Sequence, residues 1–464
     1  MTAFLRRYFT LENIRAFYMG RIYPIVVCVL VALGGIFGIE QYLGLVHTAF
    51  ILGAFLLSES IRPIIISLLT YVMQISVQHS PFYPNYSDFY SVGFWKWAFV
   101  AVVIVTSLGA LVFIIKNKIY KRVSFEKTPM LLPLIILSVV FFTNGIFSEK
   151  WTAENLIFGI TSTSVYALLF ILIYHGFSDK EHSEELAGYF AYITVLISLV
   201  ISAELIALFL TSDGVFLNGS IVKESVALGW GIWNLIGVSL SVLIPVLFYG
   251  MNRSRYPLIY FAVATLTYVM AVLTMSRNAL VFASLAYVSS VIIFCFVGNN
   301  KKMMRIIATL GVIAVIVFAV VFWDKIYALL GDYFSRGFSD NGRFTLWKTA
   351  LANFKDSPIF GSGFYGFYVE GESSFGPLPM QAHNTVLQLL SLGGIIVLIS
   401  YLYYRYKSIL PIFRRPTTTK SMLGISIAVL LLSSLLDNFI FNVYPMFYYT
   451  VALVIIHKSS AEGK

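Results

Sequence analysis

The chain has 464 residues, of which 59% are hydrophobic and only 12% are charged, and its formal net charge is +10. A soluble domain carries about 25% charged residues, so this composition excludes an ordinary soluble protein. The apolar runs do not alternate as the strands of a membrane barrel would, and we therefore predict an all-α polytopic membrane protein.

Apolar runs recur along the chain, and most are long enough to cross about 30 Å of hydrocarbon. The first run follows several arginines, as in a signal peptide, but no small-residue cleavage site follows it, so we interpret it as a retained helix. The cysteines Cys28 and Cys295 lie inside apolar runs and indicate neither a disulfide framework nor a metal site. We predict about fourteen transmembrane helices, at residues 22–38, 44–58, 63–77, 95–115, 129–145, 155–176, 187–210, 229–250, 257–275, 279–297, 306–323, 386–404, 421–436 and 441–457.

The orientation follows from the distribution of Lys and Arg, which concentrate in cytoplasmic loops. With the N-terminus in the cytoplasm, the inner segments include "KNKIYKR", "NRSR", "KKMMR" and "RYKSILPIFRR" and hold 23 of the 32 Lys and Arg. The excess of Lys and Arg over Asp and Glu therefore reflects the membrane topology, and we do not interpret it as a sign of nucleic-acid binding. We divide the chain into N-terminal transmembrane helices (1–256), a C-terminal catalytic region (257–457) and a cytoplasmic tail (458–464).

The C-terminal region contains one long extracytoplasmic loop, residues 324–385, and unstructured loops beyond about 15 residues are usually functional or disordered. The segment "NGRFTLWKTALANF" (341–354) spaces its large apolar side chains as a helix does, and Asn341 provides a start signal. We predict an amphipathic helix that lies in the outer interface with its apolar face down, which is also a common membrane anchor. Pro, Gly and aromatic residues follow at 356–367, where we expect a turn-rich lid.

The outer arginines all lie between residues 277 and 343, although the charge bias disfavours arginine on this side. Arg277 stands in "TMSRNAL" between two spans, Arg336 and Arg343 lie in the long loop, and His383 closes it. Each feature alone also has an ordinary explanation: a tight turn, an interfacial anchor or a helix cap. Their order and their common side favour one site.

These residues resemble the O-antigen ligase and Wzy polymerase superfamily of bacterial surface-polysaccharide enzymes, the Wzy_C family. Its members show a Ser-Arg between two spans, an Arg four residues before a Trp, a Pro-x-x-Gly-x-Gly turn and a His-Asn that opens the next span. All four elements occur here in order, and the resemblance covers roughly residues 257–455. They are "SRNAL" (276–280), "RFTLWKTALANFKDSPIFGSGFYGF" (343–367) and "AHNTVLQLLSLGGIIVLI" (382–399).

The resemblance implies a GT-C-like, metal-independent glycosyltransferase whose donor is a glycan on undecaprenyl diphosphate. It implies that Arg277 and Arg343 hold the diphosphate and that His383 acts at the acceptor hydroxyl. Arg336 matches no motif position, so its expected substrate-binding role rests on charge alone. We expect no cofactor, because arginine binds phosphate through paired hydrogen bonds and can neutralise the leaving group in place of a metal ion.

Other polar and aromatic residues are candidates for the substrate site. Asn384 orients His383, binds a sugar or caps the helix, and we expect Trp347 and Tyr365 beside the substrate. Glu204 is an intramembrane carboxylate, which indicates either a partner for an arginine or sugar, or a helix–helix hydrogen bond. Asp437 opens the last outer turn and either shapes the site or is an ordinary loop carboxylate.

We predict a polysaccharide polymerase in the bacterial inner membrane, with an extracytoplasmic active site. It would transfer the growing glycan from its lipid carrier onto an incoming lipid-linked repeat unit. A ligase that moves the glycan onto lipid A core or protein is the alternative, and a transporter or flippase is a third. The expected partners are the undecaprenyl-diphosphate-linked oligosaccharide, membrane lipid, and the chain-length regulator and flippase of the same pathway.

Overall fold

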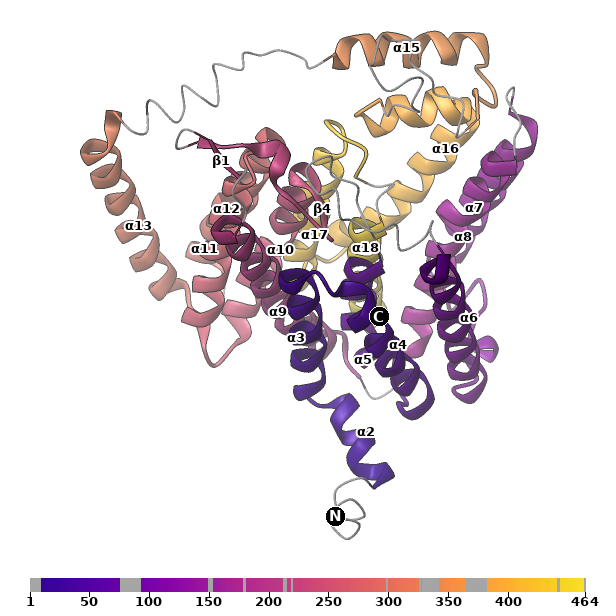
Figure 1. The fold of residues 1–464 in the computed structure, drawn as a ribbon, viewed down its shortest axis with the longest axis horizontal. Coiled ribbons are helices and arrows are strands. Elements are labelled where there is room, and N and C mark those ends of the chain that lie inside the picture. Colours follow the sequence, from indigo (N-terminus) through magenta and orange to yellow (C-terminus); the bar gives the residue numbers. More distant parts are fainter. Residues whose placement is uncertain are drawn as a thin grey trace.

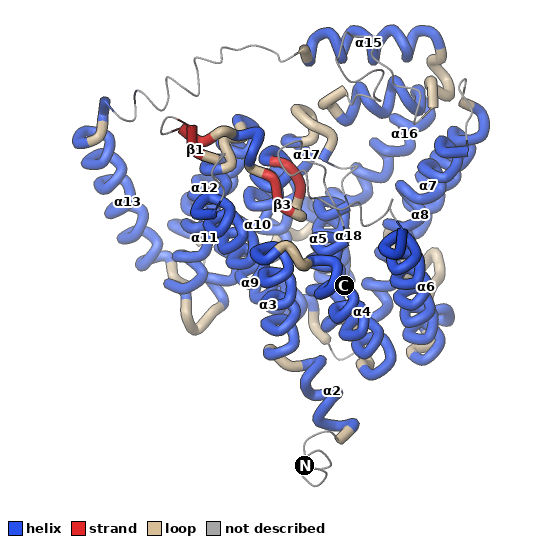
Figure 2. The backbone as a smooth tube through the Cα atoms, viewed as in Figure 1, coloured by secondary structure: helices blue, strands red, loops and turns tan. Residues whose placement is uncertain are grey.

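The computed structural model describes residues 10–75, 93–148, 153–177, 181–211, 215–217, 220–297, 299–324, 327, 342–363, 382–439 and 443–462. These residues form helices almost throughout, together with two short antiparallel hairpins (Figures 1 and 2). The N-terminal helices are α2 (Leu11–Met19), α3 (Ile22–Phe37), α4 (Glu40–Leu57), α5 (Arg62–Ile75), α6 (Gly93–Lys116), the 3-10 turn η1 (Ile119–Lys121), α7 (Leu131–Phe147), α8 (Ala153–Gly176) and α9 (Ser183–Thr211). The hairpins pair β1 (Phe216–Leu217) with β2 (Ser220–Ile221) and β3 (Ala227–Leu228) with β4 (Gly231–Ile232), with the 3-10 turn η2 (Lys223–Ser225) between them. The C-terminal helices are α10 (Trp233–Arg253), α11 (Pro257–Leu273), α12 (Arg277–Phe296), α13 (Lys301–Val321), α15 (Arg343–Asp356), α16 (Thr385–Phe413), α17 (Thr418–Ser433) and α18 (Val443–Glu462).

The helical class is confirmed, and each of the fourteen predicted spans coincides with one helix, α3 to α13 and α16 to α18. Among the described residues, six helices are long and apolar enough to cross a membrane. The number is seven if the pair α2 and α3, bent by 69°, forms one span, and five further apolar helices are shorter. The count of about fourteen spans and the GT-C-like arrangement therefore stay predictions.

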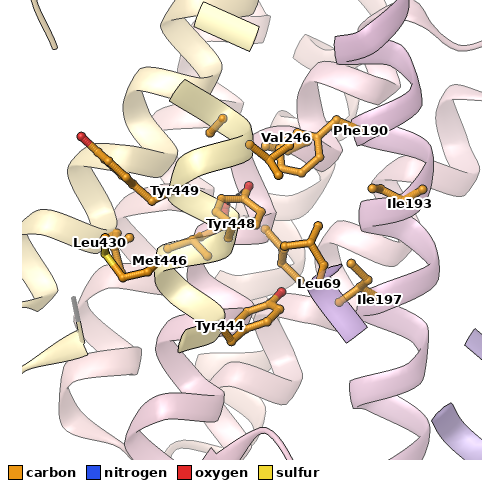
Figure 3. Packing of buried hydrophobic residues seen from close by; sticks show 14 of the residues in the cluster. Leu69, Phe190, Ile193, Ile197, Val246, Leu430, Tyr444, Met446, Tyr448 and Tyr449 are labelled. Atoms are coloured by element: carbon orange, nitrogen blue, oxygen red, sulfur yellow. Dashed lines mark hydrogen bonds between the residues drawn. The ribbon is translucent and has the colours of Figure 1, made fainter. Parts of the chain in front are cut away.

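Helix α10 lies at the centre of the bundle and packs against α9, α11, α12 and α17. Its side chains from Leu235 to Asn252 are buried without interruption, as expected for a helix that is apolar on every face. Aromatic side chains of α18 fill the neighbouring space: the ring of Tyr448 lies 5.1 Å from that of Phe190, between α18 and α9 (Figure 3). The Tyr448 hydroxyl donates to the carbonyl of Val242 at 2.9 Å, which satisfies a polar group inside this core.

The predicted helix in the outer loop is confirmed as α15, which lies across one end of the bundle against α16 (Figure 1). It begins at Arg343 after Gly342, and Asn341 lies outside the described residues. The side chains of Leu346 and Ala350 face α16 and are buried, whereas Phe344 is 60% exposed. Phe344 and Leu351, which were expected to meet the interface, are thus turned away from the protein, whereas Trp347 on the same expected face contacts it.

Helix α16 is broken at Gly394, whose φ of 66° and ψ of −168° are not helical. The break leaves backbone N–H and C=O groups without partners in the helix, and such groups need hydrogen-bond partners from elsewhere. The turn after α15 supplies them: Ser362 N–H donates to the Ser391 carbonyl at 2.9 Å and Gly363 N–H donates to the Leu392 carbonyl at 3.0 Å. The turn that follows α15 is therefore docked on the break through backbone hydrogen bonds.

Glycine is required where these two backbones meet. Gly361 (φ 69°) lies against the backbone of Leu392, and a Cβ on Gly394 would strike the carbonyl of Ile359. The Pro-x-x-Gly-x-Gly motif, Pro358 to Gly363, thus fits the broken helix because it lets two main chains approach closely.

The sequence assigned Arg405 to the cytoplasmic segment after the predicted span 386–404, and it gave no sign that this side chain is buried. Arg405 lies inside α16, which continues to Phe413, and its residue surface is 6% exposed. Its guanidinium lies 4.3 Å from the ring centre of Tyr449 and 4.7 Å from that of Tyr401. Aromatic faces attract a cation, which explains how this charge is tolerated inside the bundle.

The close approach at Gly394 generates a test of the break. We expect Gly394→Ala to destabilise the protein, because the new Cβ meets a backbone carbonyl that cannot rotate away. Gly38→Ala is the matched control: Gly38 also has a positive φ of 66°, but a Cβ there meets nothing within 4 Å. Left-handed strain costs about 1–2 kcal/mol at Gly38, whose ψ is 31°. Gly394, with a ψ of −168°, lies in a region that essentially only glycine adopts, so a larger strain and an overpacking cost of about 1–3 kcal/mol add together there. The apparent melting temperature in detergent should fall further for Gly394→Ala than for Gly38→Ala. Equal shifts would contradict the close contact between the turn after α15 and the break in α16.

Candidate functional site

His383 lies immediately before α16 and contacts the carboxylate of Asp437. The Nδ1 atom of His383 is 2.9 Å from Oδ1 of Asp437, and the two side chains are 37% and 11% exposed. His383 has a φ of 47°, a left-handed conformation that costs a residue with a side chain about 1–2 kcal/mol. A strained, partly exposed imidazole that is held by a buried carboxylate is typical of a functional site.

The carboxylate of Asp437 is held by two further groups. The backbone N–H of Asn438 donates to Oδ1 at 2.8 Å, and Nδ2 of Asn234, at the start of α10, donates to Oδ2 at 3.2 Å. Both oxygens are thus occupied, which a buried carboxylate requires. Asp437, which the sequence left as either a site residue or a loop carboxylate, is placed beside His383 and orients its ring.

Asn234 also connects this pair to the arginine-bearing turn of α12. Ser276 Oγ donates to Oδ1 of Asn234 at 2.8 Å, and Ser276 is the N-cap of α12. Arg277 is the first residue of that helix and is exposed. Met275, just before the cap, has a φ of 56°. A hydrogen-bond path therefore runs from Ser276 through Asn234 and Asp437 to His383, so Arg277 borders the same site.

Asn384 is the N-cap of α16. Its Oδ1 accepts from the N–H of Leu387 at 3.1 Å, and its Nδ2 donates to the carbonyl of Leu435 at 3.0 Å. The capping alternative is therefore the one that the geometry supports, and the side chain also ties α16 to the end of α17. Through these bonds Asn384 fixes the position of His383, its neighbour in the chain.

Trp347 connects α15 to the same turn. Its indole Nε1–H donates to the carbonyl of Ala382 at 2.9 Å, directly before His383. Arg343 lies four residues earlier, about 6 Å along the helix axis. The first turn of α15 therefore lies next to the histidine, and the expected nearness of Arg343 to His383 is consistent with this contact.

Glu204 lies in α9 and is 4% exposed. Its Oε2 accepts a hydrogen bond from Nε1–H of Trp230 at 2.7 Å, and the Trp230 ring packs edge-on against Tyr444 at 5.1 Å. Among the described residues, no arginine lies within ion-pair distance of this carboxylate. The alternative of a hydrogen bond between elements fits these contacts, and Glu204 supports the hairpin that leads into α10.

Two expected substrate residues, Arg336 and Tyr365, lie outside the described residues, as does the expected lid from Phe364 onward. Their roles stay predictions. Among the described residues, no group of three metal-ligating side chains comes together.

The N-termini of four helices border the site. Asn234, Arg277, Arg343 and Thr385 each stand at or next to the first position of α10, α12, α15 or α16. A helix N-terminus carries a partial positive charge and unpaired N–H groups, so it attracts anions. The arrangement can bind a polyanion beside an imidazole that is able to take up a proton.

A comparison with known protein families gives a match in the part of the chain that contains His383. Residues 260–402 match the Wzy_C family, which is described as O-antigen ligase. This segment is a Wzy_C domain. It contains Arg277, Arg343 and His383, whereas Asn234 and Asp437 lie outside the matched residues. No curated protein matches the chain. The domain and the apolar helices together indicate an integral membrane protein.

The sequence analysis missed three residues that build the candidate site. Asn234 links Asp437 to Ser276, and Gln388 Oε1 accepts from both Ala382 N–H at 2.6 Å and Asn438 Nδ2 at 3.0 Å. The only signal in the sequence was polarity, inside an apolar run for Asn234 and Gln388 and in the last outer turn for Asn438. That signal is shared by many residues that merely join two helices, so it could not single out Asn234, Gln388 or Asn438.

Glu204 can be tested by a pair of substitutions. We expect Glu204→Gln to retain stability and activity, because the amide oxygen still accepts from the Trp230 indole. Glu204→Leu removes that acceptor and leaves a buried N–H unpaired, which costs about 1–3 kcal/mol. Thermal unfolding and glycan transfer should both decline for the leucine variant only. Loss of transfer in Glu204→Gln, with unfolding unchanged, would show that the charge itself is used.

Proposed function

We propose that this protein transfers a glycan from undecaprenyl diphosphate onto a sugar hydroxyl at the extracytoplasmic face of the bacterial inner membrane. The observation that carries the proposal is the His383–Asp437 pair, which lies at helix N-termini that also bear Arg277 and Arg343. Membership of the matched segment in the Wzy_C family supports a lipid-linked glycan as substrate.

His383 acts as the general base in this proposal. Its Nδ1–H donates to Asp437, and this tautomer leaves the lone pair of Nε2 for the acceptor hydroxyl. The hydroxyl proton moves to Nε2 while the acceptor oxygen forms its bond to the anomeric carbon. Asp437 stabilises the imidazolium that results, as carboxylates do in other histidine-based sites.

The bond between the anomeric carbon and the diphosphate breaks in the same step, and its electron pair stays on the departing diphosphate. Arg277 and Arg343 neutralise this charge, together with the partial charges of the helix N-termini. These fixed cations perform the task that a divalent metal ion performs elsewhere, so the proposed reaction uses no metal. Attack opposite the leaving group inverts the anomeric configuration.

The acceptor we propose is a second lipid-linked repeat unit, which makes the protein a polymerase. This choice follows the expected fourteen spans, because ligases of this superfamily tend to have about twelve. The matched family is described as O-antigen ligase, which favours a ligase as the second candidate. The two candidates share the donor, the base and the leaving group, and differ only in the acceptor.

The site residues can be tested by single alanine substitutions. We expect Arg277→Ala, Arg343→Ala and His383→Ala each to lower the rate of transfer by about 100- to 1000-fold, the typical effect of removing one charge-stabilising group. Polymer ladders from cells and transfer by purified protein provide the readouts. Lys355→Ala, an exposed cation at the other end of α15, is the matched control and should behave as the wild type. Normal ladders from the three site variants, at normal protein levels, would refute the assignment.

The acceptor can be identified with purified components. We expect the protein to elongate lipid-linked repeat units when they are the only glycan supplied. The products, separated by gel or mass spectrometry, should form a ladder with the spacing of one repeat. No reaction until lipid A core or protein is added would instead establish the ligase, and no reaction with any acceptor would contradict both.

A further inference from the structure

A second polar pocket lies at the opposite ends of the helices from the His383 site. It has a volume of about 410 Å³ and lies between the turn that contains η1, the end of α8 and the end of α18. Ligand sites commonly have volumes of about 300–1,000 Å³, so this pocket can hold a small polar group. The charge-based topology places it at the cytoplasmic face of the membrane.

Cations dominate the lining of this pocket. Lys121, Arg122 and Lys127 come from η1 and the turn after it, and Lys458 comes from α18. The one carboxylate, Glu462, accepts hydrogen bonds from the backbone N–H and the hydroxyl of Ser183, at 2.8 and 2.5 Å. With four cations and one carboxylate, the lining has a formal excess of three positive charges.

The lining also has an aromatic part, and one of its residues, His175, is fixed by a buried contact. The ammonium group of Lys458 lies 5.5 Å from the ring centre of Tyr174 and 5.3 Å from that of Phe177. Nε2 of His175 is 2.8 Å from Oγ1 of Thr128, a buried contact that joins α8 to the turn before α7. These contacts hold Lys458 at the pocket, where a scattered surface lysine would be free to turn into water.

The surroundings of the pocket are those of a lipid headgroup. Tyr120 and Phe125 flank it and are 58% and 66% exposed, as is typical of side chains at a membrane–water interface. Along α6 and α8, towards the middle of the bundle, Ile115 and Leu168 present exposed apolar surface where acyl chains can lie. A soluble phosphate compound would make no use of these apolar faces.

We propose that this pocket binds the phosphate group of an anionic phospholipid of the inner leaflet. Ammonium and guanidinium groups make charge-assisted hydrogen bonds to phosphate oxygens, and basic pockets between transmembrane helices are suited to such headgroups. A bound headgroup joins the turn before α7 to the ends of α8 and α18, so it stabilises the bundle from the side opposite the His383 site.

The test compares two pairs of exposed lysines on the same predicted face. The pocket variant is Lys121→Ala with Lys127→Ala, and the control is Lys301→Ala with Lys302→Ala at the start of α13. Native mass spectrometry measures the affinity of the purified protein for phosphatidylglycerol and for phosphatidylcholine. We expect about 25-fold weaker phosphatidylglycerol binding in the pocket variant alone, about fivefold for each lysine. Adding Lys458→Ala should weaken it further.

Several outcomes would overturn the proposal. Equal affinities of the pocket and control variants would show that the lysines act only through overall charge. Equal affinity of the wild type for the two lipids would remove the case for an anionic headgroup. Inorganic phosphate alone should leave the melting temperature unchanged, and stabilisation by phosphate equal to that by phosphatidylglycerol would instead establish a site for a soluble anion. None of these measurements depends on glycan transfer.

Discussion

The carboxylate of Asp437 is the constraint on which the candidate site depends. It is buried at a turn where the chain leaves α17, and a buried carboxylate must be hydrogen-bonded to be tolerated. Its partners come from three separate parts of the chain: His383 before α16, Asn234 at the start of α10 and the backbone of Asn438. Each partner position is thereby fixed relative to the others, although the residues are up to about two hundred positions apart.

The outer loop is held by a different kind of contact, between backbones. The break in α16 at Gly394 exposes carbonyl and N–H groups that a continuous helix would satisfy, and the turn after α15 pairs with them. Trp347 adds an indole hydrogen bond at the other end of the interface, beside His383. A helix with few buried side chains can therefore be positioned accurately, because its anchors are directional hydrogen bonds.

The sequence was sufficient for the features that depend on local pattern. Every predicted span coincides with a helix, because long apolar runs of this kind form helices in membrane proteins. Helix α15 was predicted from the helical spacing of its apolar residues. The sequence could not show which face of α15 meets the protein, since Leu346 and Ala350 are no more apolar than Phe344 and Leu351. It also could not place Arg405 or Asn234, because their environments are made by helices distant in the chain.

The positions of the two arginines fit the proposed function at a small cost in local stability. Arg277 and Arg343 stand at the first positions of α12 and α15, where the helix dipole disfavours a cation by about 0.3–1 kcal/mol. A donor aimed at a developing anion typically contributes about 2.7–4 kcal/mol to a transition state. The cost to each helix is smaller than this gain. An acidic residue at either position would stabilise the helix but would repel the diphosphate. Arginine at a helix start is thus poor for folding and well suited to holding a departing diphosphate, since the dipole that opposes the arginine attracts the same anion.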